Sequence, residues 1–264
     1  MNFPLLHAER FGSQRTPPVL LLHGFLGSLN DWDQVIRLLN QDVDFLAIDL
    51  PGHGASRYIG LDYDFDRTAA EIIKILDDQG VATCPLAGYS MGGRIALYTA
   101  VKFPQRFSHL VLESCTAGVR ESQERQYRLK FEHELCQKLS SMSMPEFIND
   151  WYNAGLFDSL RQHARFNELV EARRRNDPAS LSRVVHNLGS GHMPSLWHPM
   201  QHLHMPIHFI YGERDDTYKS IAAHMVRQAK NGSLYEICNS GHNTHFENPE
   251  EFCNVIKKVL LKKE

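Results

Sequence analysis

The sequence predicts an α/β fold in which a mostly parallel sheet, flanked by helices, is interrupted by one all-helical insertion. Residues 1 to about 118 alternate strand-like and helix-like segments, a pattern typical of parallel sheets with helical crossovers. From about 119 to 203 only helical patterns occur, and from about 204 the strands return. We therefore expect one structural unit, with residues 1–118 and 204–264 as the core and 119–203 as a lid above the strand ends.

The individual elements follow from apolar patterning. The continuous apolar run Val19 to Leu22 indicates a strand buried on both faces. Further strands are expected at 43–48, 81–87, 206–211 and 233–237. Helical spacing is found at Ala69, Ile72, Ile73 and Leu76, and again at Phe252, Val255, Ile256, Val259 and Leu260. In the insertion, the expected helical segments are 120–139, 144–154, 160–175 and 179–189.

The motif Gly-x-Ser-x-Gly at residues 88–92 lies between an expected strand and an expected helix. In that context it predicts a nucleophile elbow, a tight turn that holds Ser90 clear of the sheet. The glycines Gly88 and Gly92 leave room for the turn. The alternative, that Ser90 is an ordinary helix N-cap, is disfavoured by these flanking glycines.

Two partners for Ser90 follow in the order Ser, Asp, His, which is the order of the α/β-hydrolase fold. Asp215 comes just after the strand at 206–211, and His242 lies in the loop after the strand at 233–237. We expect His242 to accept the Ser90 proton and Asp215 to orient the imidazole. Asp216 and His245 are the rivals, and His245 is expected to support the loop instead.

The apolar run ending at Leu22 leads into His23-Gly24-Phe25-Leu26-Gly27. In this fold such a loop supplies one amide of an oxyanion hole, and the residue after the nucleophile supplies the other. The backbone N–H groups of Phe25 and Met91 are therefore the expected donors. His23 is expected to brace the loop or to take part in chemistry. No catalytic role is expected for the turn at 49–54.

Composition excludes several classes of protein. The chain has 264 residues, a net charge of −3 and 42% hydrophobic residues, so neither a nucleic-acid nor a membrane partner is implied. Five scattered cysteines without CxxC spacing favour free thiols and argue against a zinc site. The first ten residues lack a leader pattern, and no apolar stretch approaches a membrane span. We expect a cytoplasmic enzyme without metal or cofactor, as a monomer or weak homo-oligomer.

The expected lid is rich in arginine, which matches carboxylates in a bidentate manner. Arg94, one turn past the elbow, is also unusual, because an apolar side chain would pack there at a lower cost in free energy. Most of the lid arginines are expected at the surface, with two or three joining Arg94 to bind a substrate that carries several carboxylates. The lid arginines are Arg120, Arg125, Arg128, Arg161, Arg165, Arg173, Arg174, Arg175 and Arg183.

Nearly end to end, the chain resembles the 2-succinyl-6-hydroxy-2,4-cyclohexadiene-1-carboxylate synthases of menaquinone biosynthesis. The segments that show the resemblance are 22–27 with Asp31-Trp32, 49–54, 88–94, 124–128, 150–152, 169–173, 212–215 and 241–249. One departure is Ser114-Cys115-Thr116, where small residues such as glycine are expected.

The resemblance implies a lyase that eliminates pyruvate from a tricarboxylate, 2-succinyl-5-enolpyruvyl-6-hydroxy-3-cyclohexene-1-carboxylate. It implies that Ser90 acts as a base, and that Tyr89 and Trp151 line the pocket. It also implies that carboxylates are held by Arg94, Arg128 and Arg173, with Arg174 and Arg175 as alternatives to Arg173. A hydrolase of the same fold, acting on esters, thioesters or carbon–carbon bonds, is the main alternative, followed by a binding protein without turnover.

Overall fold

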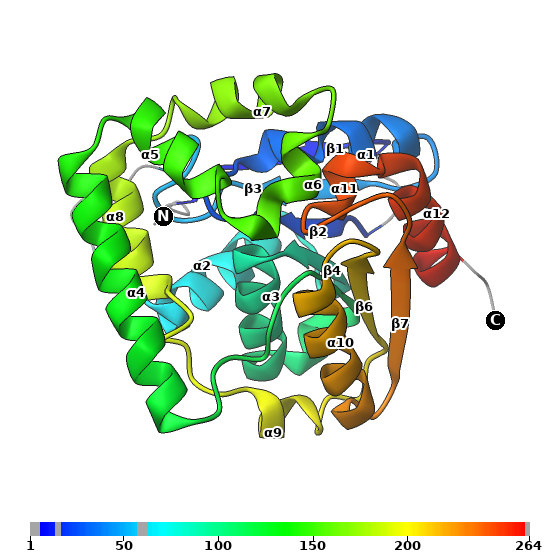
Figure 1. The fold of residues 1–264 in the computed structure, drawn as a ribbon. Helices are drawn as coiled ribbons and strands as arrows, with labels where there is room; N and C mark the ends of the chain where they lie inside the picture. Colours follow the sequence, from blue (N-terminus) through cyan, green and yellow to red (C-terminus); the bar gives the residue numbers. More distant parts are fainter. Residues whose placement is uncertain (1–5, 14–16, 57–62, 262–264) are drawn as a thin grey trace.

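A seven-stranded sheet forms the centre of the molecule (Figure 1). The computed structural model describes residues 6–13, 17–56 and 63–261, so the first five residues of the N-terminal segment lie outside it. The strands are β1 (Ala8–Phe11), β2 (Val19–Leu22), β3 (Phe45–Ile48), β4 (Cys84–Tyr89), β5 (Phe107–Glu113), β6 (Ile207–Gly212) and β7 (Gly232–Ile237). Their order is β1-β3-β2-β4-β5-β6-β7, and all neighbours are parallel except β1 and β3.

The register of the sheet explains why its strands are apolar throughout. Leu20 of β2 pairs with Leu46 on one side and Leu86 on the other, and Leu110 links Leu86 to Ile207. All five side chains in this row are at most 1% exposed. A parallel sheet covered on both faces requires such runs, and the alternation predicted for residues 1–118 and beyond 204 is confirmed.

Helices cover both faces of the sheet. One apolar cluster joins the sheet to α2 (Phe65–Asp78), α3 (Met91–Lys102) and α10 (Asp216–Gln228), and a second joins it to α1 (Asp33–Leu39) and α12 (Pro249–Leu260). Short helical turns complete this part: η1 (Leu29–Trp32), η2 (Pro104–Arg106) and α11 (Thr244–Glu247). None of the helices in the described ranges is both long enough and apolar enough to cross a membrane.

The helix ends follow local capping rules. The Asp64 carboxylate accepts a hydrogen bond from the Arg67 backbone N–H at 2.7 Å and so begins α2. Asn248 caps α12 in the same way, with Pro249 at the first helical position. The predicted apolar positions Ile72 and Leu76 of α2 are fully buried.

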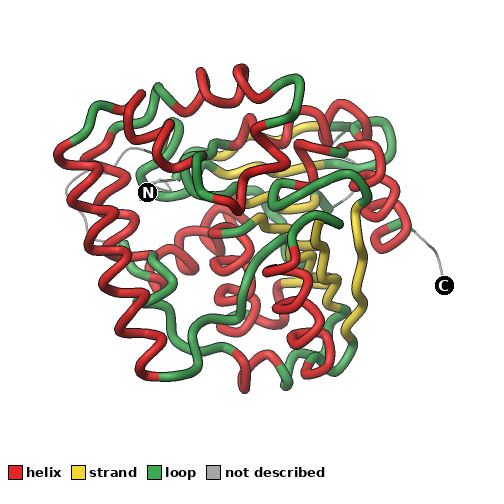
Figure 2. The backbone as a smooth tube through the Cα atoms, in the orientation of Figure 1, coloured by secondary structure: helices red, strands yellow, loops and turns green. Residues whose placement is uncertain are grey.

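Between β5 and β6 the described chain contains helices and loops but no strand (Figure 2). We call residues 119–203 the insertion. Its helices are α4 (Ser122–Ser141), α5 (Met144–Tyr152), η3 (Gly155–Phe157), α6 (Asp158–Arg161), α7 (Phe166–Arg173), α8 (Pro178–Leu188) and α9 (Trp197–Met200). α4 and α8 lie side by side (Figure 1). The single helix predicted over 160–175 is wrong in detail, because a turn at 162–165 separates α6 from α7.

Candidate active site

Ser90 occupies a tight turn between β4 and α3. Its backbone has φ 51° and ψ −107°, a strained conformation of the kind that is concentrated at functional sites. A side chain at Gly88 would come within 2.4 Å of the Gly92 carbonyl oxygen, and one at Gly92 within 2.3 Å of the Leu22 carbonyl oxygen. Both glycines are therefore required by backbone contacts, as the sequence motif predicts.

The structure brings Ser90, His242 and Asp215 together. His242 Nε2 lies 3.1 Å from Ser90 Oγ, and His242 Nδ1 lies 2.9 Å from Asp215 Oδ2. Because the carboxylate accepts, the Nδ1 atom carries the proton and Nε2 is free to accept from the serine hydroxyl. Asp215 also accepts from the Tyr218 backbone N–H at 3.0 Å, which fixes it as the N-cap of α10. Asp216 is exposed in the first turn of that helix.

His245 supports the histidine loop through Glu113. The Glu113 carboxylate accepts from His245 Nδ1 at 2.7 Å and from Thr244 Oγ1 at 2.7 Å. Its backbone carbonyl accepts from the Ser90 N–H at 2.9 Å. The His245 ring stacks on Trp32 with centroids 4.1 Å apart. Glu113 therefore connects the turn at Ser90 to the loop that carries His242 and His245. Sequence analysis did not identify Glu113, although it is the one acidic residue at the otherwise apolar end of β5.

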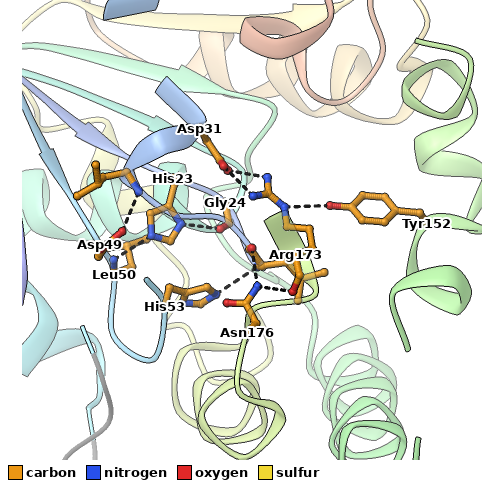
Figure 3. Close-up of polar contacts among 11 residues, drawn as sticks. His23, Gly24, Asp31, Asp49, Leu50, His53, Tyr152, Arg173 and Asn176 are labelled. Carbon is orange, nitrogen blue, oxygen red and sulfur yellow. Dashed lines mark hydrogen bonds and ion pairs between the residues drawn. The ribbon is translucent and has the colours of Figure 1, made fainter. Parts of the chain in front are cut away.

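The loop after β2 presents a free amide. The Phe25 backbone N–H and the Met91 backbone N–H donate to no other residue in the described part of the chain. The carbonyl of the Gly24–Phe25 peptide accepts from His23 Nδ1 at 2.7 Å (Figure 3). It also accepts from the Gly27 N–H at 3.0 Å. Since N–H and C=O point in opposite directions in a trans peptide, fixing this carbonyl fixes the direction of the Phe25 N–H.

Two buried histidines hold this loop against the turn at 49–54. His23 Nε2 accepts from the Leu50 N–H at 2.9 Å, and His53 Nε2 accepts from the Leu26 N–H at 3.1 Å. Burial lowers the pKa of His53 to about 3, with repulsion from His23 adding to the effect, and burial also lowers the pKa of His23. Both imidazoles are therefore neutral at pH 7 and keep the acceptor nitrogen that each backbone N–H needs.

A cavity of about 510 Å³ opens beside Ser90 and His242. All five side chains expected to bind substrate line it: Tyr89, Arg94, Arg128, Trp151 and Arg173. Phe25 and Met91 also line it. Tyr89 packs against His242, with ring centroids 5.4 Å apart, and Trp151 packs against Phe25 at 5.2 Å. Aromatic walls with a few convergent charges are typical of a small-molecule site.

Arg94 brings a partly buried positive charge into this cavity. Its Nη1 donates to the Leu188 carbonyl at 2.9 Å, and it has no ion-pair partner among the residues that the structure describes. Burial, with repulsion from Arg128, lowers the pKa of Arg94 to about 10, so the group stays charged at pH 7. Arg128 is partly exposed and pairs with the buried Glu132 at 2.8 Å. A guanidinium that is largely removed from water and has no ion-pair partner is stabilised by an anion in the cavity.

Arg173 differs from Arg94 because its charge is already paired. Its Nη1 and Nη2 donate to the two Asp31 carboxylate oxygens at 2.7 Å each, and its Nε lies 3.4 Å from the Tyr152 hydroxyl (Figure 3). Burial opposes ionisation of both groups, but the contact lowers the pKa of Asp31 and raises that of Arg173. Arg174 and Arg175 are exposed, so Arg173 is the buried member of the run.

Several other insertion arginines have structural contacts. Arg125 donates to three backbone carbonyls, and Arg120 stacks on Trp197 at 3.7 Å. Arg161, Arg165 and Arg174 pair with carboxylates on the insertion surface. No group of three or more His, Cys, Asp or Glu side chains in the described ranges is arranged to hold a metal ion.

Comparison with known proteins places this geometry in a family. The profile of the alpha/beta hydrolase fold matches residues 17–249. The 2-succinyl-6-hydroxy-2,4-cyclohexadiene-1-carboxylate synthase of Yersinia pseudotuberculosis is 32% identical over 256 residues, covering 96% of this chain and 91% of that protein. The chain belongs to this synthase family.

Two further proteins are similar to this chain. The structure of MenH from S. aureus superposes with a TM-score of 0.92 at 29% identity, covering 97% of this chain and 98% of that one. The chloroplastic protein PHYLLO of Arabidopsis thaliana is 29% identical over 260 residues, but the chain spans only 15% of its length. The fold predicted from the sequence is confirmed.

The backbone at Ser114-Cys115-Thr116, where small residues such as glycine were expected, explains why glycine would fit there. Ser114 adopts φ 46°, a left-handed conformation that glycine adopts at least cost. Cys115 packs behind the elbow, since a side chain at Gly93 would come within 2.7 Å of the Cys115 Cβ. The expectation of glycine in this stretch therefore reflects the backbone conformation at Ser114.

Proposed function

We propose that this chain eliminates pyruvate from 2-succinyl-5-enolpyruvyl-6-hydroxy-3-cyclohexene-1-carboxylate, giving 2-succinyl-6-hydroxy-2,4-cyclohexadiene-1-carboxylate for menaquinone synthesis. One observation carries the proposal. An activated serine hydroxyl shares its cavity with Arg94, a partly buried guanidinium that has no carboxylate partner in the described chain. A substrate carrying three carboxylates supplies the missing anion, whereas a neutral acyl ester does not.

The reaction begins with proton abstraction beside the succinyl ketone. The substrate C–H bond breaks, its proton passes to Ser90 Oγ, and the serine proton passes to His242 Nε2. Asp215 stabilises the imidazolium that forms. The electron pair moves onto the ketone oxygen, which the N–H groups of Phe25 and Met91 would bind.

The enolate then collapses. Its oxygen reforms the ketone, a new ring double bond forms, and the ring C–O bond to the enolpyruvyl group breaks. The departing enolate of pyruvate takes the proton held by His242, so the enzyme returns to its starting state. No metal or cofactor takes part in these steps.

The arginines divide the binding of the carboxylates. Arg94 and Arg128 would each hold one carboxylate directly. Arg173 has five N–H groups, of which three face Asp31 and Tyr152, so two remain for a third carboxylate. Tyr89 and Trp151 would contact the ring. In this proposal the insertion acts as a lid that completes the pocket, and the reaction takes place in the cytoplasm.

The test is to mix the pure protein with the enolpyruvyl substrate and to measure pyruvate by coupled reduction to lactate, together with absorbance of the conjugated diene. Pyruvate and diene should form in equal amounts, and the Ser90→Ala variant should form neither. Simple acyl esters should be turned over poorly. Rapid ester hydrolysis through an acyl-serine, without pyruvate release, would overturn the proposal in favour of a hydrolase.

A further inference from the structure

The loop that carries the Phe25 amide contacts the insertion as well as the rest of the chain, which we call the sheet domain. Leu26, the next residue, is 1% exposed and belongs to an apolar cluster built by the helical segments of the insertion from α4 to α8. Among the buried members of that cluster in the described chain, Leu26 is the only one from outside residues 119–203. Its backbone is left-handed at φ 66°, so the surroundings must hold it in place.

The carbonyl of Leu26 is held from the insertion too. Asn176, between α7 and α8, donates from Nδ2 to the Leu26 carbonyl at 2.9 Å and to the Arg173 carbonyl at 3.0 Å (Figure 3). Each of the two amide hydrogens thus has one acceptor. Arg173, the last residue of α7, lies three residues before Asn176 and binds Asp31, which follows the loop by a few residues.

We propose that Asn176 is a positioning residue for the oxyanion hole, holding the Phe25 N–H in its working direction from the insertion side. The proposal rests on the function proposed above. His23 and His53 fix the loop from the sheet domain, and Asn176 closes the remaining side. Without it, the Leu26 carbonyl loses its partner and the left-handed turn can relax.

The contact also joins substrate binding to catalysis. Arg173 lines the cavity, and its backbone carbonyl shares the Asn176 amide with Leu26. A carboxylate bound by Arg173 would steady the turn that holds the catalytic amide. Asn176 itself does not line the cavity, so its effect on the reaction is indirect.

The test compares Asn176→Ala and Asn176→Asp with the matched control Asn167→Ala, whose residue is exposed on α7. Removing a whole oxyanion donor costs about 10²- to 10³-fold in kcat. Loosening one should cost about 10-fold, with KM changed less than about twofold, because the hole acts on charge that develops in the transition state. The near-isosteric Asn176→Asp should lose at least as much, and Asn176→Gln should recover part of the rate.

A second readout does not depend on the natural substrate. A fluorophosphonate phosphonylates an activated serine with loss of fluoride, and the phosphonyl oxygen uses the same hole. The rate constant for labelling Ser90 should fall about 10-fold in Asn176→Ala and stay unchanged in Asn167→Ala. If the wild type labels but releases no pyruvate, the proposed function fails and this inference is still tested.

Two results would overturn the inference. One is a folded Asn176→Ala or Asn176→Asp variant, judged by circular dichroism, with normal kcat and normal labelling, because Asn176 would then only stabilise the turn that follows α7. The other is a raised KM with unchanged kcat, which would make Asn176 a contributor to binding alone. If Asn176→Ala does not fold, the kcat and labelling rate of Asn176→Asp decide the question, because this variant keeps the volume of the side chain.

Discussion

Replacing Asp31 by Leu should strongly destabilise the protein, because it leaves Arg173 buried without its counter-ion. The two side chains are only 10% and 5% exposed, so solvent cannot replace the lost partner. Breaking a buried pair in this way costs about 3–5 kcal/mol. At about 2.1 cal/mol/K of unfolding entropy per residue, a chain of this length has about 0.55 kcal/mol/K. The melting temperature should therefore fall by about 5–9 °C.

The assay is thermal unfolding followed by circular dichroism, with a double-mutant cycle. Asp31→Leu combined with Arg173→Met removes both charges and should recover most of the lost stability, since well-packed apolar pairs often replace buried ion pairs at little cost. The reasoning is refuted if Asp31→Leu melts within about 2 °C of the wild type. It is equally refuted if the double variant loses the sum of the two single effects.

Four further outcomes are expected. Ser90→Ala should lower kcat by several orders of magnitude without unfolding the protein, and pyruvate release at a normal rate would exclude Ser90 as the base. Asp215→Asn should abolish most activity in the same assay and Asp216→Asn should not; the reverse result would mean that the orienting acid is misassigned. Arg94→Ala should raise KM by about 10- to 150-fold, since a charged hydrogen bond contributes about 1.5–3 kcal/mol, and an unchanged KM would show that Arg94 binds no substrate carboxylate. Because the folded-state pKa of His53 lies near 3, below the unfolded value of 6.5, stability should fall as pH drops below 6.5, by up to about 2.7 kcal/mol at pH 4.5; urea unfolding should show this slope in the wild type and a shallower one in His53→Gln.

Local patterns were sufficient to predict the reactive serine and many of the helices and strands, although β1 and β5 were not among the expected strands. The elbow glycines, the apolar run of β2 and the acid after β6 each report on a few neighbouring residues, so one sequence carries the signal. The choice of Asp215 over Asp216 agrees with the geometry, because only Asp215 is buried and contacts His242.

Contacts between distant segments were not predictable in the same way. Nothing near Arg173 in sequence indicates its bond to Asp31, which lies 142 residues away. The turn that divides the predicted helix over 160–175 has a similar origin. His163 packs on Phe246 from another part of the chain, and its ring accepts from the Arg165 N–H, so a tertiary contact overrides helix propensity there.

The seating of Leu26 among the helices of residues 119–203 limits how this scaffold can be re-engineered. A chimera that exchanged the whole helical segment for that of a distant hydrolase would remove the apolar side chains that surround Leu26, together with the Asn176 amide. It would disturb the reaction centre even if the new segment folded well. Changes of specificity should therefore be easier to obtain by altering side chains on the inner surface of the existing segment than by transplanting a new one.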